Sequence, residues 1–102
     1  MMLADRLEYC LTHGNLTVAD LSRWFDRPHP TVRGWIVSEF DPRGGPHDVE
    51  HVFLMLDKLE DLIRRGRELP LKRGISRKAR IKHIERLRRD INDRLSQKGA
   101  AR

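Results

Sequence analysis

Five stretches of this chain place apolar residues at intervals of three and four, and Gly, Pro and Asn stand between several of them. This spacing puts the apolar side chains of each stretch on one face of an α-helix, whereas a half-buried strand needs strict alternation. No segment alternates convincingly. The sequence therefore predicts an all-α fold, with helices at about residues 2–13, 18–26, 29–39, 48–65 and 76–97.

Residues with a preference for helix ends support these boundaries. Thr17 is a good N-cap, and Asp20 three residues later forms a weak variant of the capping box. Gly14 and Asn15 accept the left-handed backbone that ends a helix. Proline is tolerated in a first helical turn, so the third helix is expected to begin between Pro28 and Thr31. A loop is expected at residues 41–46.

Length and composition bound the fold. The 102 residues suffice for one compact domain, and 38% of them are hydrophobic while 35% are charged, against about 25% charged in ordinary chains. No run approaches the roughly 18 apolar residues of a membrane helix, and no leader is evident, so a cytoplasmic protein is expected, nucleoid-associated or in a phage-infected cell. Cys10 is the only cysteine. It is expected to be a small buried hydrophobe.

Charge is divided unevenly along the chain. Residues 1–62 carry six basic and eleven acidic side chains, whereas residues 63–102 carry fifteen basic and four acidic ones. Such asymmetry favours a polyanionic partner, of which nucleic acid is the commonest.

The apolar stripe of the helix at 48–65 is wider than a small bundle needs, because Leu54 and Met55 extend it. Two interpretations follow. The helix is sandwiched within its own domain, or its surplus face pairs with another copy.

Residues 21–36 carry the pattern that points to a function. Small Ser22 lies where two short helices would cross, and the contact would be sealed by Leu21, Phe25, Val32, Trp35 and Ile36. Trp24 is also expected in the core. The second helix would then stand out from the domain, and an α-helix fits the major groove of DNA.

This arrangement resembles the helix-turn-helix of the Xre/Cro-type repressors of phages and bacteria. The resemblance covers roughly residues 3–65, including the Gly- and Pro-containing loop and the apolar helix after it. It departs where Asp26 replaces the usual turn glycine and Arg27 a small apolar residue. It implies a helix-turn-helix bundle of about four helices at residues 1–66 and a basic helical extension at 67–102. The implied function is a sequence-specific, DNA-binding regulator of transcription, which reads the major groove with the helix at about 29–39.

The resemblance places on DNA Arg27, His29, Thr31, Arg33, Gly34 and Val37, with Arg43 reaching from the loop. Arg33 is the best candidate for a base edge, because guanidinium pairs bidentately with guanine; a phosphate contact or simple solvation remains open. Thr31 would contact DNA or cap the helix. Gly34 costs about 1 kcal/mol in a helix interior, which close approach to DNA or to the first helix would explain. Arg43 would contact DNA or remain solvated.

The last predicted helix is strongly basic. Residues 72–89 hold nine basic side chains and one acidic one. We expect Lys78, Arg80 and Lys82 to clamp the DNA backbone, each contact steepening the salt dependence of binding by roughly 0.9 in log–log slope. The apolar residues of this helix form a narrow seam that resembles half of a coiled coil: Ile81, Ile84, Leu87, Ile91 and Leu95. The seam would pack on its own domain or on a partner.

Catalysis finds little support in the sequence. His47 and His51 have a metal-binding spacing but lack a third ligand, and no phosphate loop or activated nucleophile is present. We expect no enzyme activity, cofactor or metal, and a homodimer or higher homo-oligomer as the assembly. Two alternatives remain: a phage small terminase subunit that recognises DNA for packaging, and a basic helical adaptor that binds an acidic protein or RNA.

Overall fold

The fold comes from a computed structural model, which describes residues 3–37 and 49–100. The helices are α1 (Leu3–His13), α2 (Val18–Phe25), α3 (His29–Val37), α4 (Val49–Arg65) and α5 (Arg77–Ala100), and these described residues contain no strand. The predicted all-α fold is confirmed. The loop expected at 41–46 lies outside the described residues.

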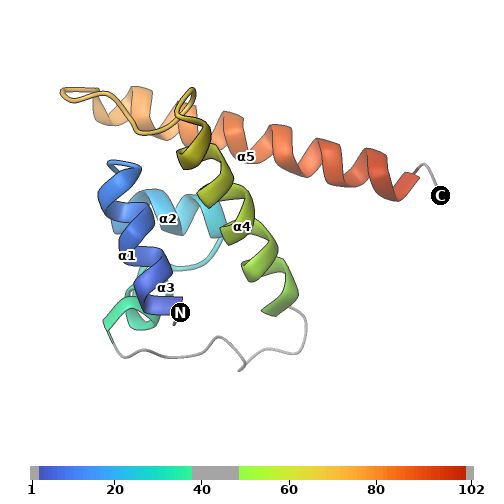
Figure 1. Cartoon of the computed structure of the whole chain (residues 1–102), viewed down its shortest axis with the longest axis horizontal. Helices are drawn as coiled ribbons and strands as arrows, with labels where there is room; N and C mark the ends of the chain where they lie inside the picture. Colours follow the sequence, from blue (N-terminus) through green and yellow to red (C-terminus); the bar gives the residue numbers. More distant parts are fainter. Residues whose placement is uncertain (1–2, 38–48, 101–102) are drawn as a thin grey trace.

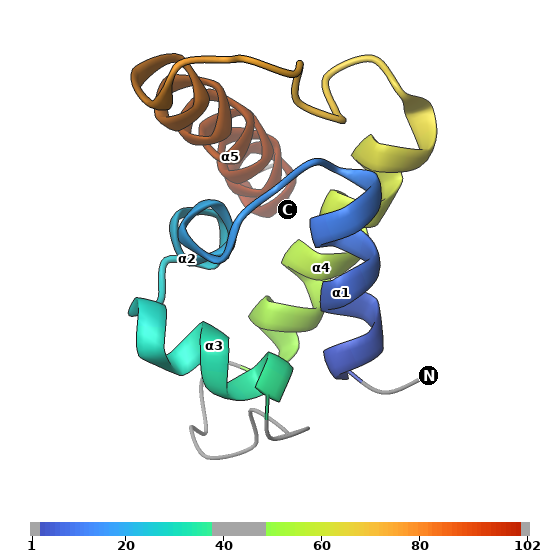
Figure 2. The same ribbon diagram turned by 90° about the vertical axis from the view of Figure 1, so that its left-hand side faces the viewer.

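The helices are arranged around α2. Figure 2 shows α2 between α5 and α3, with α1 and α4 on the other side of the molecule. In Figure 1, α5 crosses the C-terminal end of α4 and continues past it.

Local sequence explains where α2 and α5 begin. The capping box at Thr17 is complete: Thr17 Oγ1 accepts from the Asp20 backbone N–H at 3.2 Å, and Asp20 Oδ2 accepts from the Thr17 N–H at 2.9 Å. Ser76 Oγ accepts from the Ala79 N–H at 3.1 Å before α5. These contacts satisfy donors that a helix start leaves without an intrahelical partner.

The chain between α1 and α2 needs its glycine. Asn15 has φ 52°, the left-handed backbone expected at this helix end. A Cβ on Gly14 would lie 2.6 Å from the Cys10 carbonyl oxygen. Any side chain at position 14 would therefore collide with the last turn of α1.

The burial of α4 residues bears on the two interpretations of this helix. Met55, Leu56 and Leu59 are fully buried, and the Trp24 indole N–H donates to the Met55 carbonyl at 2.8 Å. Trp35 is also buried, with its ring edge-to-face to Phe25 at 5.8 Å between centroids. Met55 thus packs inside the chain's own core, which favours the sandwiched interpretation of α4.

The apolar seam of α5 joins the same core. Ile84, Leu87 and Ile91 are buried in the hydrophobic cluster that also contains Leu7 and Leu21. This part of α5 therefore packs on its own domain, which is one of the two expectations for the apolar seam.

The segment between α4 and α5 also belongs to this core. Leu69 and Leu71 are buried, the Leu71 N–H donates to the Gly14 carbonyl at 3.0 Å, and Asn15 Nδ2 donates to the Leu71 carbonyl at 2.8 Å. Buried residues thus lie on both sides of the domain boundary expected at residue 66.

Cys10 is fully buried, as expected, and burial raises the pKa of its thiol to about 12. None of the helices formed by the described residues combines the length and the apolar character required to cross a membrane.

Candidate nucleic-acid interface

Helix α3 presents two different faces. Val32 and Trp35 are 0% and 4% exposed and hold the helix on the core. Pro30, Arg33, Gly34 and Val37, spaced at i, i+3, i+4 and i+7, form a stripe on the other side. Arg33 in this stripe is exposed, and Val37 is 72% exposed. Pro30, Arg33 and Val37 are therefore exposed on the side of α3 opposite the core, and Gly34 between them is half-buried.

The other two residues predicted on this helix flank the stripe. His29 and Thr31 are exposed and lie in the first turn of α3. The Pro28 carbonyl accepts from the Thr31 and Val32 N–H groups at 3.0 and 3.2 Å. Because α3 begins at His29, Thr31 lies inside the helix and not at its N-cap.

Gly34 does not serve helix packing. No atom of the described residues lies within 4 Å of a Cβ built at this position. The explanation that Gly34 permits close approach of the first helix is therefore wrong, since no atom of α1 lies near enough to require it. Close approach of an external partner stays a prediction.

The turn between α2 and α3 is held by hydrogen bonds of its own. Asp26 adopts the left-handed conformation with φ 55°, which Asp accepts more readily than most residues. Ser22 Oγ donates to the Arg27 carbonyl at 2.5 Å, and the Arg27 N–H donates to the Ser22 carbonyl at 3.1 Å. Ser22 thus closes the turn as well as being small.

Arg27 is partly committed to this turn. Its Nη1 donates to the carbonyls of Phe25 and Asp26 at 3.2 and 2.9 Å. The guanidinium of Arg27 therefore lies against the backbone of the turn, and not along the exposed stripe of α3.

Arg80 has a different environment from the one predicted. Its Nη1 donates to Asp20 Oδ2 at 2.5 Å and to the Asn15 carbonyl at 3.2 Å, and its side chain is only 20% exposed. Arg80 lies one helical turn before buried Ile84 on the inner side of α5, so its charge is directed to α2. The structure thus gives Arg80 a structural partner in place of the predicted phosphate.

Arg88 makes the corresponding contact at the other end of α2. Its Nη1 donates to the Arg23 carbonyl at 3.0 Å, and its Nη2 lies 3.5 Å from Asp26 Oδ2. Arg80 and Arg88 are eight positions apart, or about 12 Å along the helix, which matches the length of the eight-residue helix α2. The two arginines therefore secure both ends of α2 to α5.

The other two residues predicted to clamp the DNA backbone are Lys78 and Lys82. Both are exposed, one turn apart, and share the outward face of α5 with exposed Arg89. Neither lysine makes an ion pair with any residue that the structure describes. The outward face lies opposite buried Ile84 and Leu87 and therefore points away from α2, and α2 itself lies between α5 and α3 (Figure 2).

Two of the sequence-predicted site residues lie outside the described part of the chain: Arg43 and the weak metal candidate His47. Within the part described, no three His, Cys, Asp or Glu side chains gather as a metal site would need. Sequence reasoning missed the pairing of Asp20 with Arg80 and the contact of Arg88 with α2. Neither contact has a local signal, because the partners lie 60 and 65 positions apart.

Comparison of the chain with models of known protein families, with curated proteins and with solved structures gives no match.

Proposed function

We propose that this protein binds double-stranded DNA sequence-specifically, as a transcriptional regulator of phage or bacterial type, and inserts α3 into the major groove. The observation that carries the proposal is the division of α3 between a buried face at Val32 and Trp35 and an opposite side on which Arg33 and Val37 are exposed. A helix anchored by one side and exposed along the other can enter a groove about 12 Å wide.

The chemistry of the stripe suits a base edge. Arg33 supplies a guanidinium for guanine, and Val37 supplies an apolar surface of the kind that contacts a thymine methyl group. Gly34 lies between them in sequence and adds no side chain, so the helix backbone can approach the bases closely. His29 and Thr31 supply hydrogen-bonding groups for phosphate or base.

A selection from random duplexes at near-physiological salt tests the proposal. The wild type is compared with Arg33→Ala and with Arg64→Ala, an exposed arginine at the C-terminal end of α4 that serves as the matched control. We expect the wild type and Arg64→Ala to enrich one motif and Arg33→Ala to lose preference at a guanine. No enriched motif with wild type, together with retained binding to RNA or to an acidic protein, would support the adaptor alternative instead.

The outward face of α5 is proposed to add phosphate contacts. Because Arg80 is paired with Asp20, we assign this role to Lys78, Lys82 and Arg89. Neutralising all three is expected to weaken binding to every duplex and to lower the log–log salt slope by about 2.7. An unchanged slope would remove α5 from the interface and leave α3 as the whole of it.

A further inference from the structure

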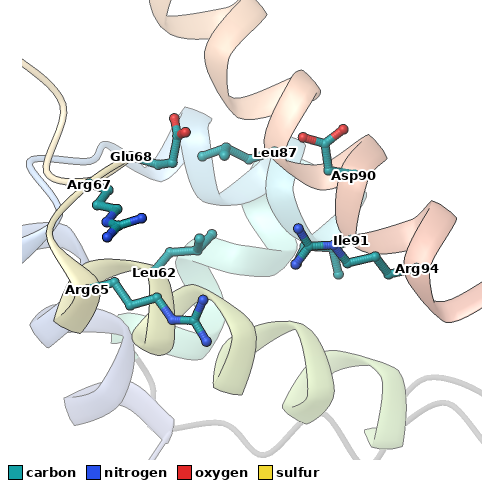
Figure 3. Close-up of a pocket in the computed structure, with 8 residues that line it drawn as sticks. All are labelled: Leu62, Arg65, Arg67, Glu68, Leu87, Asp90, Ile91 and Arg94. Carbon is teal, nitrogen blue, oxygen red and sulfur yellow. The ribbon is translucent and has the colours of Figure 1, made fainter.

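A groove of about 240 Å³ lies between the last turns of α4 and the middle of α5 (Figure 3). Its floor is apolar and is formed by Leu62, Leu87 and Ile91, while charged side chains line its rim. Leu62 stays partly exposed there. The groove is thus an apolar depression that no described side chain fills.

Three arginines and two carboxylates, Glu68 and Asp90, line the rim, so its net charge is positive, and two of the arginines have no partner in the described chain. Arg67 and Arg94 are exposed, make no ion pair or hydrogen bond with the described residues, and extend from opposite sides of Leu62 (Figure 3). Arg65 is held by Asp61 at 3.0 Å, and Glu68 is held by Arg86 at 2.7 Å. An occupant with two carboxylates and an apolar centre would match this arrangement.

The outward face of α1 has that composition. Asp5, Glu8, Tyr9 and Thr12 are spaced at i, i+3, i+4 and i+7, and all four are exposed. Tyr9 is one of two large hydrophobic side chains exposed among the described residues, with its ring 4.4 Å from that of His13 between centroids. Asp5 and Glu8 make no ion pair with any described residue.

We infer that α1 of a second copy of this chain docks in the α4–α5 groove. Tyr9 lies on Leu62 and Ile91, and Asp5 and Glu8 pair with Arg67 and Arg94. This is a helix-in-groove contact with charge complementarity at its rim. It does not depend on DNA binding and names the partner in the homo-oligomer expected for this protein.

The contact joins two different surfaces of the chain. Each copy offers one α1 face and one groove, so the association is head-to-tail and continues as an open chain unless the rotation closes a ring. Exposed ion pairs add only up to about 1 kcal/mol each and are screened by salt. We therefore expect a dissociation constant on the order of 10–100 µM that rises with ionic strength.

Sedimentation velocity of the full chain without DNA tests this contact, over about 5–500 µM at low salt. The groove variant Arg67→Glu/Arg94→Glu and the helix variant Asp5→Lys/Glu8→Lys are each expected to remain monomeric. Mixed in equal amounts, they are expected to associate again into alternating chains, because the unchanged α1 of the groove variant fits the unchanged groove of the helix variant and the two charge-reversed surfaces are also complementary. Tyr9→Ala, which changes no charge, is expected to weaken wild-type association at least tenfold.

The matched control for the groove variant is Lys72→Glu/Arg73→Glu. It makes the same change in net charge as the groove variant, at two exposed positions of the segment between α4 and α5. It is expected to associate like the wild type. A wild type that is monomeric throughout the range overturns the inference, as does association that the groove and helix variants leave unchanged. If the control abolishes association equally, net charge and not this contact is responsible. If the groove variant instead loses only DNA affinity, the groove belongs to DNA and the inference fails while the proposed function stands.

Discussion

Asp20 joins three parts of the molecule through one carboxylate. Its Oδ2 accepts from the Thr17 N–H and from Arg80, and its side chain is completely inaccessible to solvent. Its Oδ1 is buried and makes no hydrogen bond among the described residues. A buried carboxylate with a free oxygen is costly, so this residue depends on the Arg80 pairing.

Replacing Asp20 by Ala is expected to lower the free energy of unfolding by about 2–4 kcal/mol, because it removes the acceptor of the Thr17 N–H in the capping box and leaves Arg80 without its counter-charge. Denaturant titration measures this loss. The control is Asp57→Ala, whose carboxylate is 66% exposed and whose partner Arg6 keeps Glu60. That control should lose no more than about 1 kcal/mol. Equal losses in the two variants would contradict the structural role of Asp20.

A substitution at Gly34 is expected to change the stability of the fold and the affinity for DNA in opposite directions. Because no atom of the described residues lies within 4 Å of a Cβ at this position, Gly34→Ala should raise the free energy of unfolding by about 0.5–1 kcal/mol through helix propensity. If α3 approaches DNA closely, the same methyl group should weaken specific binding about tenfold. Gly66→Ala is the control, because Gly66 has φ +70° and lies outside the proposed interface. It should lower stability by about 1 kcal/mol and leave DNA affinity unchanged. A Gly34→Ala variant that binds as tightly as wild type would place the DNA contact elsewhere.

At the scale of elements, α5 contacts both ends of α2 and holds it in place. Arg80 fixes the start of α2 and Arg88 fixes its end, with Ile84 and Leu87 buried between them. The orientation of α3 depends on α2, to which the short turn at Asp26–Pro28 joins it, and on α1, against which it also packs. Helix α5, which the sequence predicts as a basic extension that clamps DNA, therefore also helps to hold α3 in position.

Arg88→Ala should loosen the α2–α3 turn. We expect faster hydrogen exchange at the Arg27 amide, a loss of about 1–2 kcal/mol in the free energy of unfolding, and weaker DNA binding with an unchanged salt slope. Lys82→Ala, on the exposed face of the same helix, should do the reverse: stability within about 0.5 kcal/mol of wild type and a slope lower by about 0.9. A lower slope for Arg88→Ala would show that Arg88 contacts phosphate directly.

The positions of the helices were easier to predict than the contacts between them. Apolar spacing placed all five within a few residues, and Thr17 with Asp20 marked the start of α2, because these signals are local. The pairing of Arg80 with Asp20 was not predictable, because an arginine beside an apolar seam has the same pattern whether it faces solvent or a carboxylate 60 residues away. The exposed face of α3 was predicted, since burial of Val32 and Trp35 dictates which side remains outside.

For the whole molecule, the question is whether the proposed DNA-binding part can fold by itself. Five aliphatic residues of the single hydrophobic cluster lie beyond residue 66: Leu69, Leu71, Ile84, Leu87 and Ile91. Full burial of such side chains contributes about 1.5–3 kcal/mol each, so together they supply on the order of 10 kcal/mol. A domain of this size is stable by only about 5–15 kcal/mol in total.

A chain ending at residue 66 should therefore lack a cooperative unfolding transition, although far-ultraviolet circular dichroism would still report some helix. A chain ending at residue 94 is the matched control, because it keeps every residue of the described core. It should unfold cooperatively at nearly the wild-type denaturant midpoint. Cooperative unfolding of the 66-residue chain, with Trp24 and Trp35 shielded from a fluorescence quencher, would contradict this expectation. It would make α5 an independent extension, as the division of charge along the sequence suggests. The contacts of Arg80 and Arg88 with α2 would then not be needed to hold α3 in position.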